Sequence, residues 1–222
     1  MKKVDAAEAD RLIRKAMGVL LEAISSRGRE GAQLRTAIGD LFAHLESYLL
    51  SDTVGRPLDS CFEQARLAGA SLTVLEQLRL ALSGEKPRTL GGQLIKDTLI
   101  QFSLTTEART IIDIKFTNRQ AVDDMIQKVN AAFAPAEEDM ADAMDAATYR
   151  DLIELHAATT RYLTEASRPL PRMIRFRFAT PLSTLYASHR LYDTAGRADE
   201  IRAENDVVHP AFMQPTGRAL SS

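Results

Sequence analysis

The side chains with the clearest chemical potential are arginines in the C-terminal quarter of the sequence. Positions 161–190 hold six arginines against Glu165 alone, a local net charge of +5. Three of them, Arg172, Arg175 and Arg177, fall within one short segment. The planar guanidinium group forms paired hydrogen bonds with carboxylates and phosphates. The pattern therefore predicts a surface that binds an anionic partner.

An acidic segment precedes these arginines. Positions 123–154 hold nine acidic side chains against Lys128 and Arg150, a local net charge of −7, although the whole chain of 222 residues carries only −2. Two other interpretations stay open: the two segments neutralise each other within the fold, or each is a solvated face. No global field favours nucleic acid at this charge balance, so a nucleic-acid contact would have to be local.

Catalytic and metal-binding chemistry has little support in the sequence. The single cysteine, Cys61, and four scattered histidines give no cluster with the spacing of zinc ligands. A dyad of Cys61 with His44 is disfavoured, because burial in an apolar helix raises the pKa of a thiol. We interpret His156 as a helix-face residue rather than a base. Phosphate-binding loops, nucleophile elbows and EF-hand spacings are missing, so we expect no enzyme, no cofactor and no metal site.

The elements that position these side chains are predicted to be mostly helices, because apolar residues recur at intervals of three and four. Residues 1–109 form the first region. Its stripes cover 12–24, 34–49, 62–82 and 94–102. The third stripe is one helix or two with a break near Gly69, and Pro57 opens it. Such short amphipathic helices must bury their apolar sides against each other or against another subunit.

Residues 110–168 are predicted to form a short strand and two helices. The β-branched run 110–116 is typical of a strand. Thr117 and Gln120 fit a capping box that begins a helix. Pro135 then separates this helix from a long acidic helix that runs from about 136 to 167.

Residues 169–222 are predicted to form a small βααβ module behind the boundary at Pro169 and Pro171. Residues 172–178 alternate with a period of two, so the arginines face outward and the apolar residues face the core. The inward set is Ile174, Phe176 and Phe178. Two short helices and an edge strand near 217–220 follow. The expected fold class is mainly α, with a helical bundle-like N-terminal part and this small C-terminal module.

Several motifs in the second half of the chain resemble one known family. They are Phe116–Ala121, Tyr149–Leu152, Pro169–Phe178, Arg190–Asp193, Arg197–Ile201, Asn205 and His209–Phe212. From about Ile112 to the end, the sequence resembles the C-terminal region of the Mu-like phage DNA circularisation proteins, also called DNA circulation proteins. The resemblance implies a component of the tail and baseplate. Family members usually begin with a β-rich domain, so we expect this chain to be a shortened version or a separate gene product.

Residues 169–222 are also similar to a LysM-type module, through Leu191–Asp193, Glu200-Ile201, Asn205 and Gly217. LysM modules of secreted proteins bind peptidoglycan sugars, whereas related modules in contractile tails are structural joints, and fold alone does not decide between these roles. The residues expected to bind a partner are Arg172, Arg175, Arg177, Tyr192, Arg197, Asn205 and His209.

We therefore expect a structural protein of a contractile or Mu-like phage tail that docks between the tail tube and the baseplate or hub. Its partners would be hub, tube and tape-measure proteins, together with further copies of itself in a ring. Two alternatives stay open: a DNA-binding protein that acts on phage genome ends through its arginines, and a peptidoglycan-binding LysM protein. The sequence holds no apolar run of membrane-spanning length, and we expect no cleaved secretory signal. We expect no membrane partner, and a location in the virion and, during assembly, in the host cytoplasm.

Overall fold

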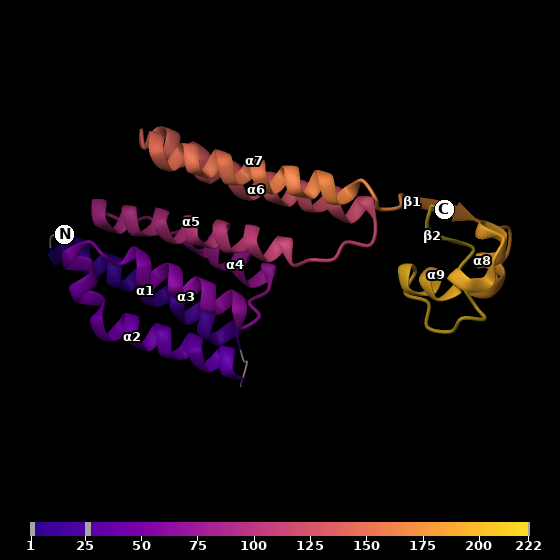
Figure 1. The fold of residues 1–222 in the computed structure, drawn as a ribbon, viewed down its shortest axis with the longest axis horizontal. Coiled ribbons are helices and arrows are strands. Elements are labelled where there is room, and N and C mark those ends of the chain that lie inside the picture. The colour runs from indigo at the N-terminus through magenta and orange to yellow at the C-terminus, as the bar shows by residue number, and fades with distance from the viewer. Residues whose placement is uncertain (1–2, 25–27, 222) are drawn as a thin grey trace. The chain divides into compact units, whose positions relative to one another are not determined.

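The computed structural model describes residues 3–24 and 28–221, and it is mainly helical with a small C-terminal sheet (Figure 1). The predicted fold class is confirmed. The elements are α1 Lys3–Ala23, α2 Arg29–Ser51, α3 Gly55–Leu67, α4 Leu72–Ser83, α5 Leu90–Ile112, α6 Arg119–Asp142, α7 Ala146–Ser167, β1 Met173–Arg177, α8 Thr184–Tyr192, the 3₁₀ turn η1 Ala195–Arg197, α9 Ala198–Glu204 and β2 Thr216–Leu220.

The chain forms two compact units. The first contains the chain up to Ile114 together with Lys128–Thr160, and the second contains Lys115–Gln127 together with the chain from Arg161 onward. Helices α6 and α7 therefore each contribute residues to both units. The first unit is a helical bundle, and the second carries the sheet.

The core of the first unit is built around α1, which packs against α2, α4 and α5. Most of its apolar stripe is fully buried, from Leu12 to Leu20, and most of the α2 stripe is buried as well, from Leu34 to Leu49. Of the two alternatives for the third stripe, the structure has two helices, and Gly69, which has a φ of 91°, separates α3 from α4. Pro57 lies in the first turn of α3, where a residue without an N–H group is tolerated.

A carboxylate on α1 fixes the start of α5. Glu8 accepts hydrogen bonds from the backbone N–H groups of Arg88 and Thr89 and from the Thr89 hydroxyl, at 2.6–3.1 Å. The Thr89 hydroxyl in turn accepts from the N–H of Gly92. A Cβ atom on Gly92 would lie 2.5 Å from the Glu8 carboxylate, so the close approach needs glycine. These bonds lower the pKa of Glu8, with the Thr89 hydroxyl as the largest cause.

A buried ion pair links α4 to α5. Arg79 Nε lies 3.0 Å from Glu107 Oε1, and both residues are buried. Burial raises the pKa of Glu107, and the neighbouring Arg79 opposes that shift. The pair therefore places a desolvated charge of each sign between two helices, where each depends on the other.

The predicted strand at 110–116 is wrong, because its first residues complete α5. The side chain of Ile111 is buried and the Thr110 hydroxyl donates to the backbone oxygen of Thr106, so both residues are satisfied within the helix. The chain from Asp113 to Asn118 then forms turns and irregular structure. Helical packing of a single apolar side chain outweighs the β propensity of the run.

The predicted boundaries of the next two helices are also wrong. Asn118, not Thr117, caps α6: its Oδ1 accepts from the N–H of Ala121 at 2.8 Å. Helix α6 continues through the exposed Pro135 to Asp142, and a turn with Met144 at a φ of 56° separates it from α7. The buried residues on either side of the proline, Phe133 and Ala136, keep the helix in place despite one lost hydrogen bond.

Candidate docking surface on the C-terminal module

The order strand, helix, helix, strand predicted for residues 169–222 is confirmed. Strands β1 and β2 pair antiparallel, and α8 and α9 lie between them in sequence (Figure 1). Ser183 caps α8 by accepting from the N–H of Tyr186, and Asp193 ends it in the left-handed region at a φ of 57°. The core consists of the buried Ala187, Ile201 and Met213, against which partly buried apolar residues pack.

Only two of the three apolar residues predicted to face the core from this segment do so. Phe176 and Phe178 pack on the core, with ring centroids 5.1 Å apart. Ile174, predicted to face the core, is 39% exposed. The core cluster is formed by α8, α9 and the loop before β2, and it packs against Phe176 and Phe178.

The outer face of the sheet gathers three arginines. Arg175 and Arg177 are two residues apart on β1 and therefore share a face. The strand register places Arg218 of β2 directly opposite Arg175. All three side chains are exposed, and among the described residues no carboxylate lies within ion-pair distance of any of them. We call this set, Arg175, Arg177 and Arg218, the arginine face.

Arg218 is the functional candidate that the sequence did not reveal. Like charges directly opposite each other across two strands are unfavourable, so the pair Arg175 and Arg218 is not explained by the stability of the sheet. The only sequence signal for Arg218 is its position next to Gly217, in a segment predicted to be an edge strand. The pairing partner of that arginine depends on the register, which composition does not give.

Arg172 does not belong to the arginine face. It precedes β1, where its backbone N–H donates to the hydroxyl of Ser221 and its backbone oxygen accepts from the N–H of Ser221. Arg172 and Arg175 are three positions apart, and residues at an odd spacing lie on opposite sides of an extended chain. The prediction that Arg172 shares a face with Arg175 and Arg177 is wrong, and Arg218, which the sequence did not single out, lies on that face.

Tyr192 and Arg197 make contacts inside the module. The Tyr192 hydroxyl donates to the backbone oxygen of Leu220 at 2.7 Å, and burial raises its pKa. The guanidinium carbon of Arg197 lies 3.9 Å from the centre of the Tyr192 ring, and its nitrogens pair with Glu200 at 2.8 Å. These contacts hold α8 and η1 against the end of β2.

Asn205 also makes its contacts inside the module. Its Nδ2 donates to the backbone oxygens of Ile201 and Arg218 at 2.8 and 2.7 Å, and its Oδ1 accepts from the N–H of Arg218 at 2.7 Å. A Cβ atom on Gly217 would lie 2.5 Å from both Asn205 Oδ1 and the Phe176 ring. Asn205 and Gly217 therefore fix the position of β2, and with it the position of Arg218.

His209 lies in the exposed loop between α9 and β2. Its Nδ1 accepts from the N–H of Ala211 at 3.3 Å, and its ring lies 5.5 Å from that of Phe212. The structure thus brings Arg175 and Arg177 together with Arg218. It places Tyr192, Arg197 and Asn205 within the module, and His209 in a separate loop.

The other chemically interesting residues make structural contacts. Cys61 is buried, which raises its pKa to about 12 as predicted in direction, and His44 donates to the backbone oxygen of Asp40. The ring nitrogens of His156 lie 2.8 Å from Glu137 Oε1 and 2.8 Å from Asn130 Oδ1.

Among the described side chains, no three His, Cys, Asp or Glu residues gather as metal ligands would. In the part of the chain with known placement, no helix is both long and apolar enough to cross a lipid bilayer.

Comparison with protein-family models and with curated proteins gives no match to this chain.

Proposed function

We propose that this protein is a non-enzymatic structural component of a contractile or Mu-like phage tail, docking between the tail tube and the baseplate or hub. The sequence resemblance from about Ile112 onward supports the class of particle. The observation that carries the docking role is the arginine face, where Arg175 stands opposite Arg218 and no described carboxylate neutralises either.

A partner with surface carboxylates would convert this unfavourable arrangement into a favourable one. Each guanidinium group offers a fork of donors that matches a carboxylate in two parallel hydrogen bonds. Neighbouring arginines on a flat sheet can bind carboxylates spaced along one strand or helix of a partner. We therefore propose an acidic protein surface as the ligand of the arginine face.

Self-association is a second part of the proposal, and apolar side chains on the helical bundle support it. Leu90 and Leu94 are 85% and 56% exposed and, being four residues apart, lie on the same side of α5. Exposed apolar patches of this kind are typical of protein interfaces. A ring of copies in a tail would cover them.

The test replaces the arginine face and measures incorporation into tails. A triple alanine variant of Arg175, Arg177 and Arg218 should keep the melting temperature of the parent, because exposed charges contribute only about 0 to 1 kcal/mol each. It should fail to assemble, because removing arginines from a docked interface costs about 2 to 5 kcal/mol for each buried pair. A triple lysine variant keeps the charge but loses the paired geometry, so it should assemble only partly.

The matched control is Arg190→Ala, which removes an exposed arginine on α8 outside the arginine face. It should assemble like the parent. Normal assembly of the triple alanine variant would contradict the docking role. Equal failure of the control would show that total charge, rather than the face, matters.

DNA binding is the alternative that the same three side chains favour. Three phosphate contacts predict a slope of about −3 for the logarithm of affinity for duplex DNA against the logarithm of salt concentration. The triple alanine variant should abolish that slope. A parent protein that does not bind duplex DNA at low salt removes this alternative and leaves the acidic protein surface.

A further inference from the structure

The turn between α6 and α7 lies at the end of a helical hairpin with an acidic surface. His156 on α7 contacts Glu137 and Asn130 on α6, so the two helices lie side by side (Figure 1). Between positions 138 and 154, six exposed carboxylates stand against Arg150 alone, a local net charge of −5. We call the six residues the acidic tip: Glu138, Asp139, Asp142, Asp145, Asp151 and Glu154.

The acidic tip is left without a counter-charge. In the part of the chain that the structure describes, none of its six carboxylates forms an ion pair. Glu138 and Asp142 are four residues apart, which places them on the same side of α6. Like charges at that spacing destabilise a helix. The stability of the hairpin therefore does not explain this pair of acids.

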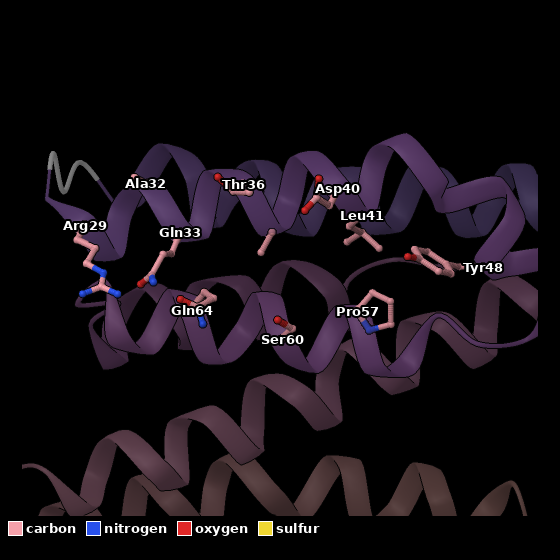
Figure 2. Close-up of a pocket in the computed structure, with 11 residues that line it drawn as sticks. Arg29, Ala32, Gln33, Thr36, Asp40, Leu41, Tyr48, Pro57, Ser60 and Gln64 are labelled. Atoms are coloured by element: carbon pink, nitrogen blue, oxygen red, sulfur yellow. The ribbon is translucent and has the colours of Figure 1, made fainter.

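Other parts of the bundle surface have acids and bases beside each other. Figure 2 shows the groove between α2 and α3, where the charged side chains that line it, Arg29 and Asp40, are of opposite sign. Between α3 and α5, Glu63 pairs with both Arg66 and Arg109. Acids with a cation nearby attract a basic partner less than the acidic tip does.

The arginine face matches the acidic tip in charge and in spacing. Arg175 and Arg177 are two residues apart on β1, or about 6.6 Å. Arg218 lies about 5 Å across the sheet from Arg175. On the tip, the Cβ atoms of Glu138 and Asp142 are about 5 to 6 Å apart. Neighbouring guanidinium groups can therefore each bind one carboxylate of the same helix through paired hydrogen bonds.

The chain is too short for one copy to pair its own two surfaces. The link before β1 is fixed at the start of α6, because Arg119 donates from its backbone N–H to Pro171 and from its side chain to Leu170. From Pro171 to Arg175 the chain spans at most about 14 Å. Helix α6 places Asp142 about 35 Å from Arg119. The difference of about 20 Å is longer than an arginine side chain.

We propose that the arginine face of one copy binds the acidic tip of a second copy, so that copies join head to tail. This contact rests on the proposed function, because it assigns a partner to the same arginine face. Its two surfaces are different patches of one chain, so the contact is heterologous. A heterologous contact closes into a ring or continues as an open chain of copies.

Charge reversal on each side tests the contact by sedimentation equilibrium of the full-length protein. The face variant carries Arg175→Glu, Arg177→Glu and Arg218→Glu, and the tip variant carries Glu138→Lys and Asp142→Lys. The parent should self-associate at low salt, at least about tenfold more weakly when salt rises from about 0.05 to 0.5 M. Each variant alone should self-associate at least about a hundredfold more weakly than the parent, because like charges then meet.

Mixtures of the two variants identify the pairing. In an equimolar mixture, the reversed face meets the reversed tip and the native face meets the native tip, so association should return to the level of the parent. A chain that carries both sets of substitutions should associate with itself and not with the parent. Restored association requires the two surfaces to contact each other, because a loss caused by charge elsewhere would persist in the mixture.

The matched control is Asp123→Lys with Asp124→Lys, which reverses two exposed acids near the start of α6, outside the acidic tip. It should self-associate like the parent. The tip variant also gives a test that does not depend on the fold of the reversed sheet. Added to the parent, it should bind through its native arginine face, offer no acidic tip, and so lower the mean mass of the assemblies.

Equal association of the parent and both variants overturns the proposal, as does a mixture that stays dissociated. A parent that remains monomeric at low salt also overturns it. In that case, failure of the triple alanine variant to enter tails would leave the acidic surface of another tail protein as the ligand of the arginine face. Normal entry of the triple alanine variant into tails would instead contradict the proposed function itself.

Discussion

Replacement of Asn205 by alanine should unfold the sheet of the C-terminal module while the helical bundle stays intact. The substitution removes three hydrogen bonds of 2.7–2.8 Å, two to the backbone of Arg218 in β2 and one to the backbone oxygen of Ile201 in α9. At about 0.5 to 1.5 kcal/mol net for each bond, the loss is about 1.5 to 4.5 kcal/mol. A unit of this size has a free energy of unfolding of about 4 to 11 kcal/mol. The variant therefore loses a large part of its stability.

Hydrogen exchange followed by mass spectrometry is the suitable assay, because helices of the bundle dominate the circular dichroism spectrum. Peptides that cover β2 should exchange about ten to a thousand times faster in Asn205→Ala, and peptides from α1 should be unchanged. The control is Gln214→Ala, which removes an exposed amide from the same module. Unchanged protection of β2 in Asn205→Ala would refute the structural role assigned to the amide.

Three more predictions concern the helical bundle. Arg79→Met should lower the free energy of unfolding by about 3 to 5 kcal/mol in a urea titration, because Glu107 is left buried without its partner; Arg79→Met with Glu107→Leu should recover most of it. Because the pKa of Glu8 is lowered from 4.5 in the folded state, its contribution to stability is present above that pH and is lost as the pH falls. Glu8→Gln should therefore show a shallower loss of melting temperature below pH 4.5 than the parent. Cys61, with its pKa raised to about 12 by burial, should not react with a disulfide reagent at pH 8 until urea unfolds the bundle; rapid reaction in native buffer would contradict the assignment.

The helices of the bundle were predictable because their stability depends mainly on the burial of one apolar side. The stripes in α1 and α2 repeat at three and four residues, and each is buried as a continuous row. Pro57 and Gly69 also act locally: the first is tolerated in the first turn of a helix, and the second adopts a backbone conformation that other residues avoid. Local rules are sufficient wherever no distant residue competes with them.

Prediction failed where a distant contact decides the local structure. The run from Thr110 has the composition of a strand, yet the burial of Ile111 extends α5 through it. Pro135 has the properties of a helix breaker, yet buried residues on both sides of it keep α6 continuous. Each error overestimates propensity relative to packing, which contributes more free energy per residue than propensity does.

The candidate sites were predictable only in part. Alternation along one strand identifies Arg175 and Arg177, because the period of two is a property of the strand itself. The third arginine needs the register between β1 and β2. That register is not encoded in the spacing of neighbouring residues, so it leaves no motif.

Arg218 connects the stability of the module to its proposed docking role. Its backbone N–H and C=O bond to the side chain of Asn205, and the strand register holds it opposite Arg175. Loss of the Asn205 amide releases the strand that carries one of the three guanidinium groups, so Asn205→Ala should weaken docking together with the protection of β2. Arg218→Ala keeps these backbone bonds and loses only an exposed 3.3 Å hydrogen bond from its guanidinium to the backbone oxygen of Glu204. It should therefore weaken docking while β2 stays protected. The contrast between the two variants distinguishes a residue that positions the arginine face from a residue that binds the partner.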